Sequence, residues 1–236
     1  MTDDRWRSPL GSRYASPAMQ RLWGEPHRIG LWRRVWLALV FAWERFQRYR
    51  AEAALREMRA HLDDADLSAA AAYEKRFRHD VMAHVHHFGD QAPTARPFLH
   101  LGATSAFVTD NADLLVMRAG LRLILGRLLK VLDALGAFAE RHAGEPCLAY
   151  THFQPAQLTT VGKRATLWMQ DFAADVEDTC HRIETMKLRG CKGTTGTQAS
   201  FLELFRGDHA KVRELDRRVA DRLGAVEQDL HARQVE

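Results

Sequence analysis

Residues 109–142 read TDNADLLVMRAGLRLILGRLLKVLDALGAFAERH, and this stretch decides the fold. Its apolar residues recur every three or four positions, as they do along one face of a helix. The main stripe consists of Leu114, Leu121, Leu125, Leu128, Leu132, Leu135 and Phe138, and further aliphatic residues cover much of the remaining surface. The pattern predicts a helix about 45–50 Å long. A helix that is apolar on most sides is usually buried by several others. The chain offers few helices of equal length, so we expect either oligomerisation or further sequence.

The next polar stretch, residues 150–164, reads YTHFQPAQLTTVGKR. We expect it to lead into a second long helix over about residues 157–188, with Pro155 in the first turn, where its missing N–H has no intrahelical partner. His152 then lies beside the positive end of that helix, which attracts anions. Two interpretations stay open: a proton-transfer residue that faces an anionic substrate, or a polar cap on a buried helix.

Two loops are rich in hydrogen-bond donors. Residues 100–105 read HLGATS, in which a glycine turn presents Thr104 and Ser105 either to an anion such as a carboxylate or as caps of the next helix. Residues 190–200 read GCKGTTGTQAS, a composition typical of phosphate loops but without the order G-x-x-x-x-G-K-[ST]. The second loop is therefore interpreted as a flexible, donor-rich segment and not as a nucleoside triphosphate site.

The N-terminal part begins with an irregular segment, residues 1–27, punctuated by proline and glycine. Within it, Arg13 and Tyr14 either bind an anion or belong to a disordered leader. Residues 29–58 have a helical pattern with tryptophan on one broad face, which predicts core or subunit packing.

A further helix is expected from Ser68, as its N-cap, into residues 78–87, RHDVMAHVHH. The spacing of the four histidines does not favour a metal site. Asp80 beside His79 either fixes the tautomer of that histidine or belongs to a solvated helix end. A short amphipathic helix is expected over residues 208–223.

Composition narrows the class of protein. The 236 residues carry 34 basic and 30 acidic side chains, a net charge of +4, and the basic residues are scattered among acids, so we expect no nucleic-acid partner. Three cysteines without C-x-x-C spacing favour reduced thiols. The apolar run of residues 35–43 is too short for a membrane span, and no secretory signal is recognised. We expect a soluble, cytoplasmic protein.

Five motifs together resemble adenylosuccinate lyase of the animal-type branch, in the fumarase/aspartase superfamily. They are SRYAS (12–16), RHDVMAHVH (78–86), HLGATS (100–105), THFQPAQLTTVGKR (151–164) and KGTTGTQASF (192–201). The resemblance implies an all-α subunit, with an N-terminal helical domain over residues 1–103 and part of a long-helix bundle domain over residues 104–236. It also implies a homotetramer whose active sites are built from several subunits. The implied reaction is β-elimination of fumarate from adenylosuccinate, and from succinylaminoimidazole carboxamide ribotide, without a cofactor or metal.

The resemblance also implies roles for individual residues. His152 matches the general acid that protonates the departing nitrogen, and His79 matches a second catalytic histidine. The substrate-binding residues would be Arg13 and Tyr14 at the nucleotide phosphate, Thr104 and Ser105 at the succinyl carboxylates, Arg78 and Asp80 beside His79, and Thr151, Lys192, Thr194 and Thr195 nearby. Fixed cationic, amide and hydroxyl donors suit this reaction, since elimination develops negative charge on a carbon next to a carboxylate.

One departure qualifies the resemblance. The family's signature loop, Ser-Ser-x-Met-Pro-x-Lys-x-Asn-Pro, which carries the serine base, does not occur in these 236 residues. We therefore expect a truncated, N-terminal half of such an enzyme, which forms a homo-oligomer or a hetero-oligomer with full-length subunits and is active only when complemented by subunits that supply that loop. The alternative is a catalytically inactive, lyase-like interaction protein that forms hetero-oligomers.

Overall fold

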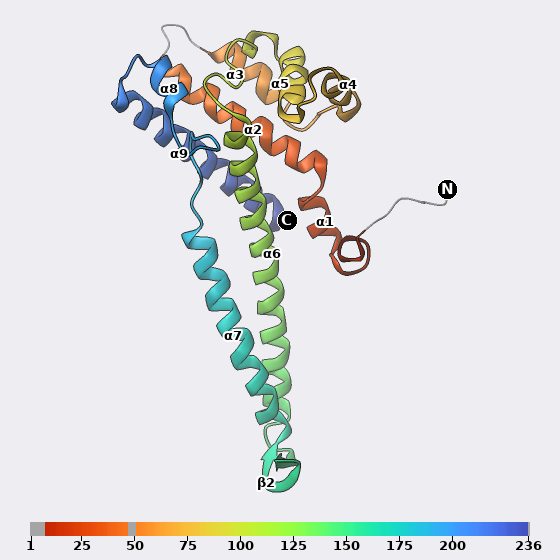
Figure 1. Ribbon diagram of the computed structural model, residues 1–236. Helices are drawn as coiled ribbons and strands as arrows, with labels where there is room; N and C mark the ends of the chain where they lie inside the picture. The colour runs from red at the N-terminus through yellow and green to blue at the C-terminus, as the bar shows by residue number, and fades with distance from the viewer. Residues whose placement is uncertain (1–7, 47–50, 236) are drawn as a thin grey trace, which may run out of the picture. The chain divides into compact units, whose positions relative to one another are not determined.

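The computed structural model describes residues 8–46 and 51–235, which are helical apart from one two-stranded hairpin (Figure 1). The α-helices are α1 (Pro17–Leu22), α2 (Glu25–Glu44), α3 (Glu52–Ala60), α4 (Leu67–Phe77), α5 (Asp80–Gln91), α6 (Ser105–Arg141), α7 (Val161–Thr185), α8 (Ala199–Leu204) and α9 (His209–Val235). A π-helix η1 (Leu10–Tyr14), a 3₁₀ helix η2 (Pro93–Ala95) and the strands β1 (Pro146–Thr151) and β2 (Gln154–Thr160) complete the list. The all-α prediction is confirmed.

These residues form two compact units, each of which is described by itself. The first comprises the residues up to Met117 together with those from Lys187 onward, and the second comprises Arg118–Met186. The expected domain boundary between residues 103 and 104 stays a prediction. Among the described residues, no helix has both the length and the apolarity that crossing a bilayer requires.

Helix α2 forms the centre of the first unit. It is buried on nearly every side, and α3 and α9 both contact it. Trp36 is fully buried, with its ring 6.2 Å from that of Phe88 on α5, and Trp43 lies 4.8 Å from Phe205. The tryptophan-rich face is thus core, as predicted. The expected single helix over residues 29–58 is instead divided between α2 and α3, and part of the segment between them lies outside the described residues.

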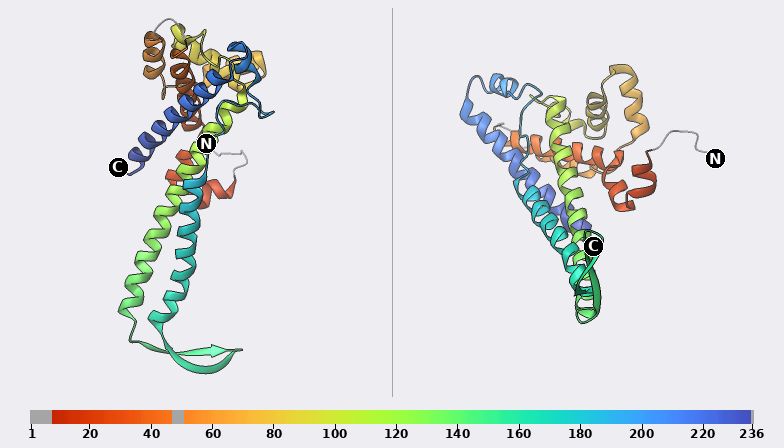
Figure 2. Two further views of the ribbon diagram at one scale, coloured as in Figure 1. Left: turned by 90° about the vertical axis from the view of Figure 1, so that its left-hand side faces the viewer. Right: turned by 60° about the horizontal axis from the view of Figure 1, so that its bottom comes forward.

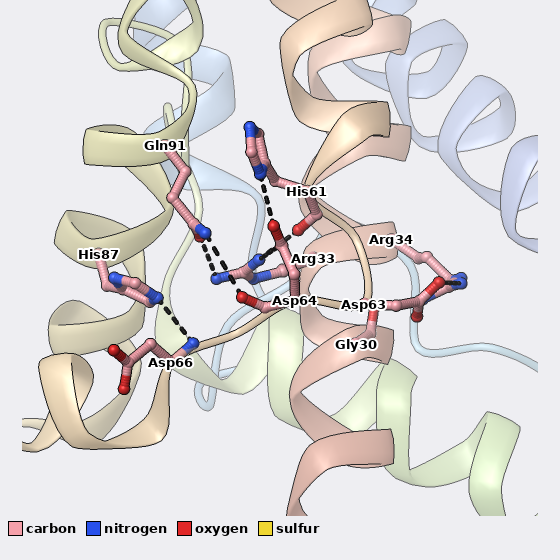
Figure 3. Close-up of polar contacts among 9 residues, drawn as sticks. All are labelled: Gly30, Arg33, Arg34, His61, Asp63, Asp64, Asp66, His87 and Gln91. Carbon is pink, nitrogen blue, oxygen red and sulfur yellow. Dashed lines mark hydrogen bonds and ion pairs between the residues drawn. The ribbon is translucent and has the colours of Figure 1, made fainter.

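Polar contacts fasten the turn between α3 and α4 to the core (Figure 3). Arg33, only 1% exposed, donates to Gln91 Oε1 at 2.6 Å and to Asp64 Oδ1 at 3.1 Å. Arg34 donates one hydrogen bond to each carboxylate oxygen of Asp63, both at 2.8 Å. Burial lowers the pKa of Arg33, while the charge of Asp64 opposes that shift. Both arginines are therefore satisfied by the turn, as buried charges must be.

The same turn corrects the predicted cap of α4. Ser68 lies inside the helix, and Asp66 is the N-cap residue. The Asp66 carboxylate accepts from the backbone N–H groups of Ser68 at 2.9 Å and Ala69 at 3.0 Å. Asp66 therefore occupies the position from which a carboxylate reaches the second and third amides of a helix, while its own N–H donates to His87 Nε2 at 3.1 Å.

The second unit consists of the continuation of α6, the β1–β2 hairpin and α7 (Figure 2). The two helices approach closely at Gly162, where a side chain would clash with the backbone carbonyl of Ala139. The Gly162 N–H donates to His142 O at 3.0 Å, and the N–H of Val161 donates to Glu145 O at the same distance. A glycine at this position lets the start of α7 pack directly on the end of α6.

Candidate functional site

A cleft of about 410 Å³ in the first unit brings together two loops that are far apart in the sequence. Gly102 and Thr104, just before α6, form one side. Residues of the loop between α7 and α8 and of the start of α8 form the other: Lys192, Gly193, Thr194, Thr195, Thr197, Ala199, Ser200 and Phe201. We call this the Lys192 cleft. Four predicted substrate-binding residues thus share one site: Thr104, Lys192, Thr194 and Thr195.

A buried asparagine of α6 holds the start of that loop. Asn111 is fully buried, and its amide nitrogen donates to Phe107 O at 2.7 Å and Gly190 O at 3.1 Å. Its amide oxygen accepts from the N–H groups of Arg189 at 3.0 Å and Gly190 at 3.2 Å. A single side chain therefore replaces the backbone partners that the loop lacks.

Helix α9 supplies a second anchor. Asp216 Oδ1 accepts from the N–H of Cys191 at 2.6 Å. Burial raises the pKa of the Cys191 thiol, and the neighbouring Asp216 charge raises it further, so this thiol stays protonated. Gly190 has a φ of 70°, and a side chain there would clash with the Asp216 carboxylate. The loop can follow this path only with glycine at residue 190.

Close packing sets the width of the cleft. A Cβ atom on Gly193 would lie 2.8 Å from Thr104 Cγ2. On Gly102, which has a φ of 76°, it would lie 2.8 Å from a methyl carbon of Leu204. Ser200 Oγ donates to Gly102 O at 2.7 Å, which ties α8 to the turn before α6.

The electrostatics of the Lys192 cleft favour an anion. Its lining presents five hydroxyl groups and one ammonium group, and none of the described residues that line it is acidic. Helix α6 begins at Ser105, directly after Thr104, so its positive N-terminal end lies at the same place. Hydroxyl donors, a lysine and a helix N-terminus together suit a carboxylate or phosphate group.

Arg78, His79 and Asp80 lie at the junction of α4 and α5, which the sequence analysis wrongly predicted as continuous helix. Arg78 ends α4 in the left-handed conformation, with a φ of 53°. His79 is the N-cap of α5, and its Nδ1 accepts from the N–H of Met82 at 3.4 Å. Asp80 Oδ1 also lies 3.4 Å from His79 Nδ1. The expected Asp–His neighbourhood is present, in a helix cap and not along a helix face.

His100 joins this neighbourhood as a neutral histidine. Its Nδ1 accepts from the indole N–H of Trp36 at 3.0 Å, so its proton resides on Nε2. Burial lowers its pKa to about 4, and the charge of His79 contributes to the shift. Two residues further along, Gly102 lines the Lys192 cleft. His100 is therefore positioned as a neutral N–H donor near the predicted site residues.

Arg13 and Tyr14 lie on η1, a short helix in a segment expected to be irregular. Both side chains are exposed, and the Arg13 guanidinium lies 5.8 Å from the centre of the Tyr14 ring. The contacts described for the chain do not join either residue to the Lys192 cleft. Ser105 is the first residue of α6, beside the cleft.

Thr151 and His152 belong to the second unit, and there the prediction of a helix at Pro155 is wrong. Residues Gln154–Thr160 pair with Pro146–Thr151 as an antiparallel strand, and α7 begins only at Val161. Pairing of the two strands outweighs the local helical signal, and Pro155 is tolerated because every strand of a two-stranded sheet has a free edge. Thr160 caps α7 by accepting from Lys163 N–H at 3.1 Å.

His152 therefore lies in a hairpin turn and not beside a helix end. His152 and Phe153 form a two-residue loop with φ values of 48° and 59°, a backbone that glycine and asparagine prefer. The His152 side chain is exposed, and the neighbouring Phe153 is 97% exposed. The imidazole is thus fully available to a ligand or another polypeptide.

Comparisons with known proteins give one consistent result. No family model matches the chain. The chain is 47% identical over 224 residues to adenylosuccinate lyase of Saccharomyces cerevisiae, a match covering 94% of this chain and 46% of the relative. It is also 47% identical to adenylosuccinate lyase of Schizosaccharomyces pombe, covering 91% of this chain and 45% of that relative. The chain is homologous to adenylosuccinate lyase. It spans about half the length of the curated relatives it matches.

Solved structures support the fold. A fumarate lyase from Mesorhizobium sp. BNC1 has a TM-score of 0.74 at 25% identity, covering 89% of this chain and 48% of that protein. The 3-carboxy-cis,cis-muconate lactonizing enzyme from Pseudomonas putida has a TM-score of 0.75 at 21% identity, covering 91% and 48%. The predicted fumarase/aspartase-type fold is confirmed.

Three residues around the predicted site residues have no role predicted from the sequence. Asn111 and Asp216 hold the loop that carries Lys192, and His100 lies beside the Arg78–Asp80 segment in a neutral form. For Asn111, the one signal in the sequence is its position as a polar residue among the apolar residues of α6. Nothing in the sequence marks Asp216, because its partner lies 25 residues away in a loop.

Proposed function

We propose that this chain supplies the substrate-binding and general-acid part of an adenylosuccinate lyase. The reaction would be that of a carbon–nitrogen lyase: β-elimination of fumarate from adenylosuccinate, giving AMP, and from succinylaminoimidazole carboxamide ribotide. The observation that carries this proposal is the Lys192 cleft, which joins Thr104 to Lys192, Thr194 and Thr195 around an acid-free, hydroxyl-lined space. The homology to adenylosuccinate lyases supports it.

Each group has a distinct task in this reaction. The Lys192 ammonium and the threonine hydroxyls would hold a succinyl carboxylate and stabilise the negative charge that develops on the adjacent carbon. A base removes the proton from that carbon, and the carbon–nitrogen bond then breaks to leave fumarate. His152 would donate a proton to the departing nitrogen, and His79 would act as the second catalytic histidine. Arg13 and Tyr14 would bind the nucleotide phosphate, while Ser105, Arg78, Asp80 and Thr151 complete the substrate contacts.

The base would come from another polypeptide that carries the missing loop, in a hetero-oligomer with longer subunits. The second unit supports such an assembly because large apolar side chains remain exposed along its helices: Ile124, Leu129 and Phe138 of α6, and Leu167 and Trp168 of α7. Long helices with apolar residues on outward faces are typical of bundles completed by other subunits.

A complementation assay tests this proposal. The purified chain is assayed for fumarate release alone and after mixing with a full-length yeast adenylosuccinate lyase whose histidine aligned with His152 is replaced. We expect activity in the mixture because this chain supplies the acid and its partner the base. His152→Gln in this chain should abolish that activity, while His209→Gln, at the start of α9, should leave it unchanged. A mixture without activity, despite co-assembly in light scattering, would refute the proposal.

A second function rests on the same exposed residues. If the chain only joins or perturbs full-length tetramers as an inactive, lyase-like protein, it should co-assemble through α6 and α7 without restoring activity. Ile124→Glu together with Leu167→Glu should then abolish co-assembly, because two charges would enter an apolar interface. The two readouts, assembly and fumarate release, separate the two functions.

A further inference from the structure

The first unit contains another cleft, of about 270 Å³, that shares no lining residue with the Lys192 cleft. Its lining residues come from α2, from the end of α3 and the turn after it, and from α9, which contacts α2. Three of its lining residues are arginines: Arg34, Arg59 and Arg222. The others are apolar: Leu37, Ala38, Leu62, Ala225 and Val226. We call it the arginine cleft.

The three guanidinium groups differ in the partners that they contact. Arg34 is held by Asp63 and by Gly30 O, so its charge is largely balanced. Arg222 is half-buried, and its guanidinium lies 5.0 Å above the centre of the Phe41 ring. Stacking on an aromatic ring fixes the orientation of a guanidinium without neutralising it. Arg59 is exposed at the end of α3.

Neither Arg59 nor Arg222 forms an ion pair with a carboxylate among the side chains that the structure describes. No acidic residue belongs to the lining of the cleft either. Elsewhere in the first unit, cations commonly have acidic partners: Arg217 and Arg218 both contact Glu214, and Lys211 contacts Asp208. The arginine cleft therefore concentrates positive charge against an apolar wall.

We propose that the arginine cleft binds a phosphate monoester with a compact apolar or aromatic body. Guanidinium groups match the oxygen geometry of a phosphate and bind it through paired hydrogen bonds. Two arginines without acidic partners suit a dianion, and the leucine, alanine and valine side chains suit an apolar body. The volume falls just below the roughly 300–1,000 Å³ range of pockets for drug-sized ligands, so the ligand is small.

Isothermal titration of the full chain with phenyl phosphate tests this proposal. Arg59→Gln and Arg222→Gln should each weaken binding by about tenfold, which is the loss of a charged hydrogen bond. Arg56→Gln is the matched control because it removes the same charge from an exposed position of α3 outside the cleft. Inorganic phosphate should bind more weakly than phenyl phosphate, and phenol should not bind.

Two further variants distinguish this cleft from other anion sites. Ala225→Trp fills the cleft without altering its charge and should abolish binding, with circular dichroism confirming that the chain remains folded. Lys192→Gln should leave phenyl phosphate binding unchanged, whatever its effect on lyase activity. Equal loss in Arg56→Gln and Arg59→Gln, unchanged binding in Ala225→Trp, or loss only in Lys192→Gln would each overturn the proposal.

Discussion

Replacing Asn111 with alanine removes the side chain that holds the Lys192 loop to α6. Four hydrogen bonds disappear, at 2.7 to 3.2 Å. Phe107 O keeps its helical partner and Gly190 O keeps the N–H of Lys192 at 3.0 Å, whereas the N–H groups of Arg189 and Gly190 lose their acceptor. These two N–H groups, one part-buried and one buried, then have no acceptor.

The size of the effect follows from those two groups. An unsatisfied buried donor or acceptor costs about 1–3 kcal/mol. Because the loop can shift and water can enter the space left by the amide, we take the lower end for each group. Asn111→Ala should therefore lower the free energy of unfolding by about 2 kcal/mol, a substantial part of the roughly 5–15 kcal/mol of a typical domain.

Urea denaturation followed by circular dichroism measures this loss, with limited trypsin digestion as a local probe. Asp110→Ala is the matched control. Asp110 precedes Asn111 and contacts Arg189 only through a partly exposed ion pair at 3.8 Å, which is worth about 1 kcal/mol or less. Trypsin should cleave faster at Lys192 in Asn111→Ala but not in Asp110→Ala. Equal stability losses in the two variants would refute the reasoning that the buried amide anchors the loop.

Other predictions test the core, the hairpin and the caps. Burial and the nearby Arg33 charge lower the pKa of His84 to about 4. Between about pH 6.5 and 4 the unfolded chain therefore binds a proton that the folded chain does not. The free energy of unfolding should fall by about 3 kcal/mol as the pH is lowered across this window. As the pH is lowered, the urea midpoint of His84→Phe should fall less steeply than that of the native chain. Gly162→Ala should lower stability by about 1–3 kcal/mol through overpacking, whereas Gly126→Ala, which meets no atom within 4 Å, should be neutral or slightly stabilising. Asp66→Ala should cost about 1 kcal/mol as a lost N-cap, and Ser68→Ala less; the reverse order in thermal denaturation would restore Ser68 as the cap.

The long helices were predictable because their signal is local. The apolar stripe over residues 109–142 predicts α6 to within a few residues of its observed bounds, Ser105–Arg141. A periodic pattern of that length leaves no competing structure. The boundary at Arg78 was not predictable in the same way, because the residue ends α4 by adopting a positive φ without a glycine or proline to signal it.

The hairpin and the cleft depend on contacts between distant residues. Residues Gln154–Thr160 become a strand because Pro146–Thr151 lies beside them, and that pairing cannot be read from either segment alone. The Lys192 cleft likewise requires Asn111 to meet Gly190, 79 residues further along the chain. The resemblance to a known family named Thr104 and Lys192 as site residues, but the structure was needed to show what holds them together.

The turn at His152 and Phe153 has a physical feature that the second unit does not itself explain. Two consecutive side-chain-bearing residues hold positive φ values, which L-amino acids adopt only at a cost. Such strain persists where the surroundings enforce it or where function uses it. Within the second unit, Phe153 is 97% exposed, so packing of the phenyl ring cannot offset the strain. An Asn-Gly pair would form the same turn with less strain. In the assembly proposed above, the Phe153 ring would become buried against another subunit, and that contact would fix the position of the neighbouring His152 imidazole.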